Sequence, residues 1–368
     1  MLFRSCLSID RDFFTSLGLK FQAINAQAGE IVHDIIPEGG SLEPCRIFLE
    51  QIHRADPSFI LGYTPDCDGD RGNLVIWDEA QARILDAQEV FALACLAELA
   101  CLAWEGKLTD DSAPSKAAVA VNDPTSLRIE RIAAAFNVSV YRCEVGEANV
   151  VALAEKLRKD GYLVKIAGEG SNGGCIIHPS KARDPLNTVI SLLKLLAIKS
   201  RENKPGPFEL WLKKSNQGEQ YRDNFGLSDI VNSLPRFVTT GAYDEKAVLK
   251  INTTDHGALK KRYQQIFLSE WNENREKLKT RCGILGWEAF AYNGITEKRG
   301  IKNFEDAGKG GLKICFLNEA GTAIASIWMR GSATEPIFRI MADVEGEDRS
   351  MERELIEWQR RMALQADL

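Results

Sequence analysis

Short apolar runs alternate with helix-like segments in the middle of the chain. Three strand-like runs and two helix-like segments follow one another at 117–121, 125–136, 138–141, 147–159 and 162–167. Strands that alternate with helices of about ten residues or more are usually joined as βαβ units with a mostly parallel sheet. The alternation therefore predicts α/β architecture, which we extend to Ala197.

Further elements are expected on both sides of this region. The sequence predicts a strand at 2–9, a short helix from Asp10 to Leu17, a strand at 21–24 and a helix from Ser41. Asp86 and Glu89 form a capping-box pattern for an Ala- and Leu-rich helix that ends near Gly106. Residues 199–224 are polar and contain proline and glycine, so they are typical of a linker or insertion. Beyond them, strands at 248–252, 314–317, 323–328 and 337–342, with helices at 255–276 and from Ser350, predict a small α+β domain.

Length and composition set the expected domain count and compartment. A chain of 368 residues favours two to three domains: α/β domains at 1–85 and 86–200, a linker or insertion at 201–240 and an α+β domain at 241–368.

The net charge of -6 argues against a broad nucleic-acid-binding face. Nine cysteines without C-x-x-C spacing and four histidines give no zinc framework and favour reduced thiols. The apolar stretch 90–104 contains Glu98 and is too short for a membrane span. We expect a cytoplasmic protein with no nucleic-acid or membrane partner.

An acidic loop lies between the apolar runs 59–63 and 74–77. Residues 66–71 read Asp-Cys-Asp-Gly-Asp-Arg. Alternate residues of an extended segment point the same way, so Asp66, Asp68 and Asp70 are expected to converge. Three close carboxylates repel one another unless a hard cation binds between them, and Mg2+ takes oxygen ligands while leaving positions for substrate phosphate. The loop is therefore a candidate magnesium site.

Two alternatives compete with this metal site. A D-x-D-x-D sequence in a polar loop is more often an ordinary solvated turn. An EF-hand loop requires glycine at its sixth position and glutamate at its twelfth, and counting from Asp66 these positions are Arg71 and Trp77. The sequence excludes the EF-hand and leaves the solvated turn open.

A glycine-rich loop follows the strand-like run that ends at Ala167. Residues 168–174 read Gly-Glu-Gly-Ser-Asn-Gly-Gly and match the dinucleotide fingerprint G-x-G-x-x-G. That fingerprint requires a helix to begin at once, whereas a β-like run and Pro179 follow here, so a nicotinamide cofactor is disfavoured. Glycines allow a polyol to approach the backbone, and Glu169 and Ser171 could bind its hydroxyls. A glycine-rich turn without a ligand is an equally good interpretation of this loop alone.

An arginine-bearing loop lies near the C-terminus. Residues 330–336 read Arg-Gly-Ser-Ala-Thr-Glu-Pro, and Arg339 follows. Guanidinium groups match phosphate geometry, and hydroxyls can bind the remaining phosphate oxygens. The loop is a candidate phosphate site, although an ordinary surface turn is the commoner explanation of such a sequence.

The order of the three loops resembles the α-D-phosphohexomutase superfamily, the phosphoglucomutases and phosphomannomutases. Members have a metal loop D-G-D-x-D-R, a sugar loop G-E-x-S-G and a phosphate loop R-x-S-G-T-E-P followed by arginine. Here these are 66–71, 168–173 and 330–336 with Arg339. The resemblance extends over essentially the whole chain. It implies two mixed or parallel-sheet α/β domains of phosphohexomutase type and a C-terminal α+β domain like the TATA-box-binding protein.

The resemblance implies a role for each loop. Asp66, Asp68 and Asp70 would bind Mg2+, and Arg71, the one catalytic residue expected in this chain, would lie beside the transferring phosphoryl group. The residues expected to bind a phosphorylated hexose are Glu169, Ser171, Asn172, Arg330, Ser332, Thr334 and Arg339. The family reaction interconverts hexose 1-phosphate and hexose 6-phosphate, with glucose or mannose as the hexose. Hexose 1,6-bisphosphate is the intermediate and activator, so Mg2+ and this bisphosphate are the expected cofactors.

Several positions depart from the family pattern. Cys67, Asn172 and Ala333 stand where glycine is usual, which removes no side-chain ligand. The sugar-specificity turn of the family carries a lysine after glycine, whereas residues 145–149 contain none, so the preferred hexose stays open.

The phosphoserine loop of the family, T-x-S-H-N-P, does not occur in the sequence, and none of the four histidines follows a serine. The chain therefore resembles domains two to four, and we expect a fragment that is inactive alone, with the missing first domain as its partner. Two alternatives remain. One is a non-catalytic sugar-phosphate-binding protein that has lost the catalytic domain, and the other is a phosphatase with Asp66 as nucleophile.

Overall fold

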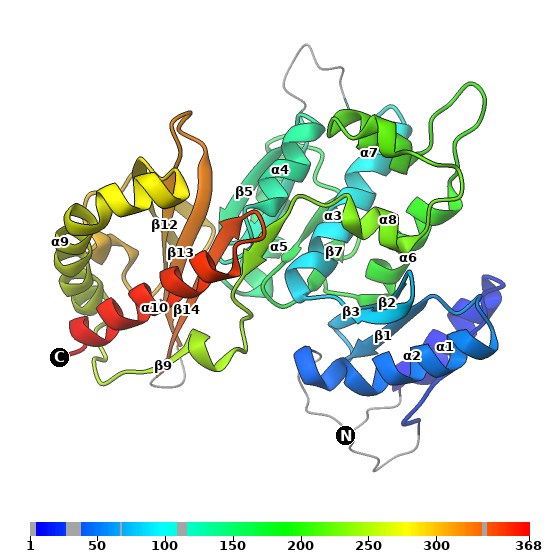
Figure 1. Cartoon of the computed structure of the whole chain (residues 1–368), viewed down its shortest axis with the longest axis horizontal. Helices are drawn as coiled ribbons and strands as arrows, with labels where there is room; N and C mark the ends of the chain where they lie inside the picture. The colour runs from blue at the N-terminus through cyan, green and yellow to red at the C-terminus, as the bar shows by residue number, and fades with distance from the viewer. Residues whose placement is uncertain (1–4, 27–37, 67, 109–115, 333–336) are drawn as a thin grey trace. The chain divides into compact units, whose positions relative to one another are not determined.

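The computed structural model describes residues 5–26, 38–66, 68–108, 116–332 and 337–368 (Figure 1). The chain forms two compact units. The first contains residues 1–117, 132–138 and 163–234, and the second contains residues 118–131, 139–162 and 235–368. The domain boundaries expected from the sequence stay a prediction.

The first unit begins with helices around a three-stranded antiparallel sheet of order β1-β2-β3. Its first elements are α1 (Ser5–Ser16), the 3-10 helix η1 (Gly39–Leu42), α2 (Glu43–Ala55), β1 (Leu61–Pro65), β2 (Gly72–Asp78) and β3 (Gln81–Ile84). The predicted helix after Ser41 is confirmed: Leu42, Leu49 and Ile52 recur at helical spacing and pack on this sheet.

The two strands predicted near the N-terminus are wrong. Residues 2–4 of the first lie outside the described residues, residues 5–16 form α1, and residues 21–24 have no strand pairing. Phe21 instead stacks on Phe14 of α1, with ring centroids 5.9 Å apart. A short apolar run fits a strand and a buried helix equally well, so its partner decides between them.

Helix α3 (Ala87–Trp104) is the buried centre of the first unit. Its predicted capping box is confirmed: Glu89 N donates to Asp86 Oδ1 at 2.7 Å, and Asp86 N donates to Glu89 Oε2 at 3.3 Å. The expectation that this stretch is too short for a membrane span is wrong, because the helix extends to 18 residues with a mean hydropathy of 1.5, but 83% of it is buried within the protein. Within it, Glu98 accepts a hydrogen bond from Ser191 Oγ at 2.7 Å and pairs with Lys194, so its buried charge is compensated.

Further elements of the first unit pack around α3. They are β6 (Ile166–Glu169), β7 (Gly174–Ile177), α6 (Pro185–Ala197), α7 (Pro207–Lys214), the 3-10 helix η2 (Gly218–Gln220) and α8 (Leu227–Asn232). The polar segment read as a linker or insertion thus contains helices. Trp211 of α7 is buried, stacks on Phe136 and donates to Ser233 Oγ at 2.8 Å. These contacts tie α7 to the core.

Strand direction follows connection length. The predicted βαβ unit is present in β4 (Ala118–Asn122), α4 (Arg128–Ala135) and β5 (Ser139–Cys143), where β4 and β5 are parallel, and α5 (Glu147–Lys159) follows. By contrast, β1 pairs β2 and β6 pairs β7 in antiparallel hairpins. The loops 66–71 and 170–173 are too short for a crossover, so these strands cannot be parallel. The fold therefore contains both parallel and antiparallel strand pairs, as the predicted fold class allows.

The second unit contains the C-terminal α+β part that was predicted. Its sheet has the order β11-β10-β12-β13-β14-β8, with β9 also paired to β14, and every pair is antiparallel. The strands are β8 (Phe237–Thr239), β9 (Val248–Lys250), β10 (Gly286–Asn293), β11 (Thr296–Arg299), β12 (Gly311–Leu317), β13 (Ala323–Gly331) and β14 (Ile337–Glu345). The remaining elements are the 3-10 helices η3 (Glu245–Ala247) and η4 (Phe304–Ala307) and the helices α9 (His256–Cys282) and α10 (Arg349–Ala366).

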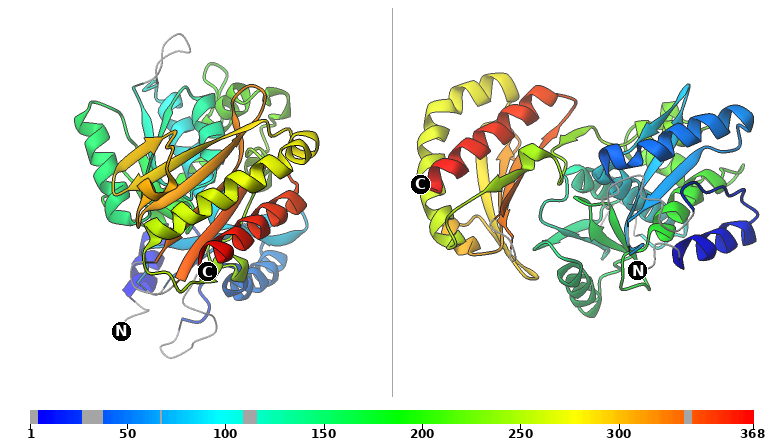
Figure 2. Two further views of the ribbon diagram at one scale, coloured as in Figure 1. Left: turned by 90° about the vertical axis from the view of Figure 1, so that its left-hand side faces the viewer. Right: turned by 90° about the horizontal axis from the view of Figure 1, so that it is seen from below.

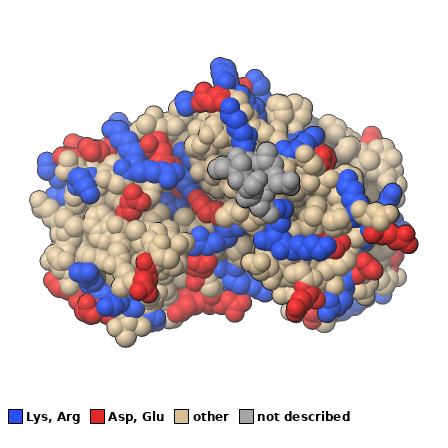
Figure 3. Space-filling view, turned by 90° about the horizontal axis from the view of Figure 1, so that it is seen from above, with Lys and Arg blue, Asp and Glu red and all other residues tan. Residues whose placement is uncertain are grey.

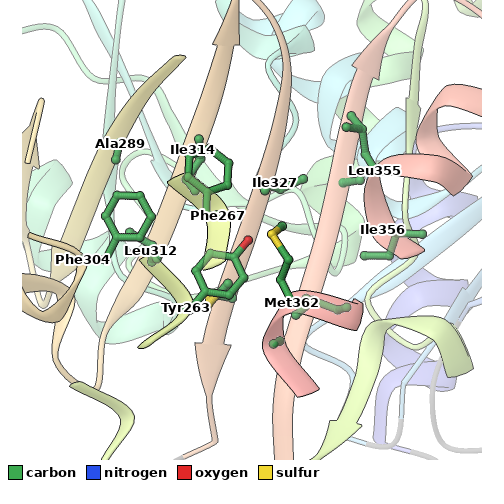
Figure 4. Packing of buried hydrophobic residues seen from close by; sticks show 14 of the residues in the cluster. Tyr263, Phe267, Ala289, Phe304, Leu312, Ile314, Ile327, Leu355, Ile356 and Met362 are labelled. Carbon is green, nitrogen blue, oxygen red and sulfur yellow. The ribbon is translucent and has the colours of Figure 1, made fainter. Parts of the chain in front are cut away.

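Helices α9 and α10 cover the same face of this sheet (Figure 2). Tyr263 and Phe267 of α9 lie four residues apart and face strand residues such as Ile314 and Ile327 in one cluster (Figure 4). Met362 of α10 lies in the same cluster. This core holds the hairpin β13–β14, which carries the arginine-bearing loop, on a rigid base.

Candidate functional site

The acidic loop is a tight bend between β1 and β2 in the first unit. Asp66 N donates to Arg71 O at 2.9 Å, and Gly69 N donates to Asp66 O at 3.2 Å. Gly69 has a φ of 73°, a left-handed conformation that glycine adopts without strain. The predicted extended segment is wrong, because the loop has to reverse the chain between two antiparallel strands. The bend nevertheless brings the three carboxylates together.

The carboxylate cluster fits a divalent cation. Ligand oxygens of Asp66, Asp68 and Asp70 lie within 4.8 Å of one another. Two oxygens on opposite sides of Mg2+ are about 4 Å apart, so the cluster would need to contract only slightly. Oδ1 of Asp70 is buried and has no hydrogen-bond partner among the residues that the structure describes. A buried carboxylate oxygen in this state fits a site that a cation completes.

Arg71 stabilises the acidic loop from within. Its Nε lies 2.7 Å from Asp66 Oδ2 and 3.6 Å from Asp70 Oδ1, and its backbone N donates to Asp66 Oδ1 at 3.2 Å. The Asp66 side chain is only 1% exposed, and both of its oxygens accept hydrogen bonds from Arg71. The role of Arg71 beside a phosphoryl group stays a prediction.

The glycine-rich loop connects β6 to β7 in the same unit. Asn172 N donates to Glu169 O at 3.1 Å, Asn172 Oδ1 accepts from Gly174 N at 3.0 Å, and Asn172 Nδ2 lies 3.3 Å from Glu169 Oε2. The Asn172 side chain, predicted to bind substrate, therefore supports the loop in this structure, and Ser171 is buried beside it. The strand β7 and not a helix follows the loop, so the described residues 168–177 do not have the strand–loop–helix geometry of a dinucleotide site.

Arg183 joins these two loops, and the sequence motifs gave no indication of it. Its Nη1 lies 3.0 Å from Glu169 Oε2, and its Nη2 pairs with Asp70 Oδ2. Asp70 and Glu169 lie far apart in sequence, and one guanidinium binds both carboxylates. The first unit therefore brings the predicted metal residues and the predicted sugar residue Glu169 into one site.

The arginine-bearing loop belongs to the second unit. Arg330 of β13 and Arg339 of β14 are directly opposite in the strand register, which places their side chains on the same face of the sheet. Ser332 N donates to Ile337 O at 2.7 Å and closes the base of the loop. Thr334 lies outside the described residues. Arg339 Nη1 donates to Ala242 O at 2.6 Å, and its guanidinium carbon lies 5.4 Å from the ring centroid of Tyr243.

Two further residues next to this loop lie outside the predicted motifs. Glu144 accepts a hydrogen bond from Arg330 Nε at 2.9 Å. The His256 ring occupies the space that a Cβ at position 331 would need, so only glycine fits there. Burial, with Lys260 and Lys309 nearby, lowers the pKa of His256. Neither residue has a local sequence signal beyond its position after a strand or at a helix start.

Comparisons with known proteins agree with this architecture. The family model for phosphoglucomutase/phosphomannomutase, alpha/beta/alpha domain III, matches residues 97–209. No curated protein matches the chain. The segment 97–209 includes the sugar loop and the βαβ unit, and it excludes the acidic and arginine-bearing loops.

Solved structures share the fold over nearly the whole chain. A phosphoglucomutase/phosphomannomutase family protein from Burkholderia thailandensis has a TM-score of 0.56 at 16% identity, over 98% of this chain and 58% of its own. The open form of the exocytosis-sensitive phosphoprotein parafusin, a phosphoglucomutase from Paramecium, has a TM-score of 0.52 at 13% identity, over 96% of this chain and 55% of its own. The chain thus spans slightly more than half the length of these structures. Residues 97–209 therefore match one domain of the phosphoglucomutase/phosphomannomutase family, and nearly the whole chain shares the fold of these solved structures.

Proposed function

We propose that this chain binds a phosphorylated hexose together with Mg2+, as the substrate-binding part of a phosphohexomutase. The reaction would interconvert the 1-phosphate and 6-phosphate of glucose or mannose through hexose 1,6-bisphosphate. The observation that carries the proposal is the ion-paired cluster in the first unit, where Arg183 binds both Asp70 of the acidic loop and Glu169 of the sugar loop.

The proposed chemistry divides between the two units. Asp66, Asp68 and Asp70 would hold Mg2+, which when bound supplies charge neutralisation for the transferring phosphoryl group. Glu169 would accept hydrogen bonds from sugar hydroxyls. Arg330 and Arg339, paired across β13 and β14, would bind the phosphate that is not being transferred. Positioning and fixed charge would account for most of the rate enhancement in such a reaction.

The absence of a T-x-S-H-N-P motif from the 368 residues decides what the chain should do alone. These 368 residues therefore contain no counterpart of the family's phosphoserine, which donates and accepts the phosphoryl group. We therefore expect binding of the bisphosphate without turnover, and we expect a partner domain to supply the serine.

Calorimetric titration with glucose 1,6-bisphosphate, with and without Mg2+, tests this proposal. We expect binding that Mg2+ tightens by about tenfold, because neutralised carboxylates no longer repel the phosphate. Asp68 is the exposed member of the cluster, so Asp68→Asn should remove the Mg2+ effect without loss of folding. Asp78→Asn is the matched control, since Asp78 belongs to the same hairpin and pairs only loosely with Arg83, at 3.7 Å. Absence of binding under both conditions would refute the proposal.

Two alternatives make different predictions. A non-catalytic sugar-phosphate-binding protein would also bind the bisphosphate, but a phosphorylated T-x-S-H-N-P domain added to it would not restore turnover. A phosphatase would use Asp66 as nucleophile, yet both oxygens of that buried carboxylate accept hydrogen bonds from Arg71. Slow release of phosphate from generic esters, abolished in Asp66→Asn, would favour the phosphatase.

The expected partner and compartment follow from charge and cysteine chemistry. Lys and Arg side chains are mixed with Asp and Glu on the face shown in Figure 3, which supports local recognition of an anion over binding to a polyanionic surface. The seven cysteines that the structure describes are free thiols, which supports a cytoplasmic location. We propose a phosphorylated hexose as the ligand, with no nucleic-acid or membrane partner.

A further inference from the structure

Arg183 has the contacts of a residue that transmits a change from one loop to the other. It donates to the carboxylate of Glu169 in the sugar loop and pairs with that of Asp70 in the acidic loop. Its side chain is 17% exposed, so water screens these ion pairs only partly. Because the guanidinium is planar and each of its two Nη atoms binds one carboxylate, it fixes the relative position of the two carboxylates.

The backbone that carries Arg183 is itself held in place. The next residue, Asp184, caps α6 by accepting from Leu186 N at 2.9 Å, and Asp184 N donates to Cys175 O at 3.1 Å. The Arg183 stem crosses Gly174, where a Cβ would lie 2.5 Å from Arg183 Cδ. The arginine therefore approaches the site from a fixed helix start, and its guanidinium cannot easily follow one loop without moving the other.

Asp70 is the point where a cation would act on Arg183. Asp70 belongs to the carboxylate cluster. Its Oδ2 pairs with Arg183, whereas its Oδ1 is buried, lies 3.6 Å from Arg71 Nε and has no hydrogen-bond partner in the described part of the chain. A cation bound in that cluster would fix the Asp70 carboxylate. Through the shared guanidinium it would also fix Glu169 and the loop that carries it.

We propose that Arg183 is a positioning residue that couples cation binding at Asp66, Asp68 and Asp70 to the conformation of the sugar loop. The inference rests on the proposed cation site, and it adds a residue outside the three loop motifs. Coupling free energies between sites in one protein usually correspond to about 5- to 150-fold changes in affinity or population, so the effect should be measurable.

Hydrogen exchange of the full chain, followed by mass spectrometry with and without Mg2+, tests the coupling. In the unmodified protein, Mg2+ should slow exchange by about fivefold or more in peptides that cover both loops, 60–76 and 164–178. In Arg183→Met, only the acidic-loop peptide should respond. Arg183→Lys should give a smaller sugar-loop response than the unmodified protein, because a single ammonium group replaces a guanidinium that binds two carboxylates through separate nitrogens.

Arg46→Met is the matched control. Arg46 also bridges two carboxylates in the first unit, those of Glu43 and Glu50 on α2. The substitution Arg46→Met should therefore leave the Mg2+ responses of both loops unchanged. If Arg183→Met does not fold, Arg183→Lys carries the comparison. An equal sugar-loop response in the unmodified protein and the Arg183 variants would overturn the coupling. The coupling would also be overturned if Mg2+ slowed exchange in the acidic loop of the unmodified protein but not in its sugar loop. No response in either loop would instead refute the proposed cation site, and the coupling with it.

Discussion

Arg330 donates through Nε to Oε1 of Glu144 at 2.9 Å, so an arginine expected to bind phosphate already contacts a carboxylate. Glu144 is held in turn by Gly294, whose N donates to Oε2 at 2.8 Å and whose O accepts from Glu144 N at 2.8 Å. The second unit therefore fixes a negative charge beside the predicted phosphate loop. This charge should orient Arg330 and at the same time oppose an incoming phosphate.

Glu144→Gln should increase phosphate affinity. The amide oxygen can still accept from Arg330 Nε, but the repulsive charge is removed, so we expect about three- to tenfold tighter binding of glucose 1-phosphate at low ionic strength. The gain should shrink at high salt. Calorimetry at two salt concentrations measures both effects, with Glu147→Gln in the same turn as control. Unchanged or weaker binding would show that Glu144 does not face the phosphate.

Asp123→Asn should change the pH dependence of stability in the second unit. Burial raises the pKa of Asp123 to about 7, although a 2.5 Å hydrogen bond from Trp328 Nε1 and the charges of Lys313 and Arg330 oppose the shift. Because the folded pKa lies above the model-peptide value of 3.8, the group's stabilising contribution is fully present below about pH 4 and is lost as pH rises through 7. Relative to Asp123→Asn, the unmodified protein should lose about 1–3 kcal/mol between pH 5 and pH 8.

Urea unfolding at several pH values, followed by the fluorescence of tryptophans such as Trp328, measures this difference. Parallel stability curves for the two proteins would show that Asp123 does not titrate in this range. The asparagine keeps an acceptor for Trp328 Nε1, so the hydrogen bond itself is not what the comparison tests.

Lys194→Met should destabilise the first unit. Glu98 is 1% exposed, and its carboxylate pairs with Lys194, with Ser191 as a second donor. Removing the lysine leaves a buried charge with one neutral partner, which should cost about 2–4 kcal/mol of unfolding free energy. The double variant Glu98→Leu with Lys194→Met should recover most of that loss, since no buried charge remains. A double variant as unstable as Lys194→Met would indicate a packing defect instead.

Gly311→Ala should destabilise the second unit, because the added methyl group would overlap Asp123. Gly311 begins β12, between β10 and β13, and an added Cβ would overlap Asp123 Oδ2 and lie 2.9 Å from Trp328 Nε1. We expect a loss of about 2–4 kcal/mol, measured by thermal or urea unfolding. Gly286→Ala at the start of β10 meets no atom within 4 Å and should be neutral. Equal effects of the two substitutions would contradict the close approach of Asp123.

Long periodic segments were the most predictable part of the fold. Helix α5 forms over Glu147–Lys159, the residues expected from its pattern, and the capping box at Asp86 and Glu89 starts α3 as predicted. These features depend on neighbours within one or two turns, so the local sequence specifies them. The prediction of a strand at 2–9 was wrong because so short an apolar run fits a strand and a helix equally well until its packing partner is known.

The sequence by itself determined the chemistry and order of the three loops and the class of the fold. The tertiary structure decided how those loops are held. Asp66, Asp68 and Asp70 meet through a bend around Gly69 and not through an extended strand. Arg183 and Glu144 became visible only as contacts of Glu169 and Arg330. The physical reason is that an ion pair depends on which backbones come within a side chain's reach, and that is set by the packing of elements distant in sequence.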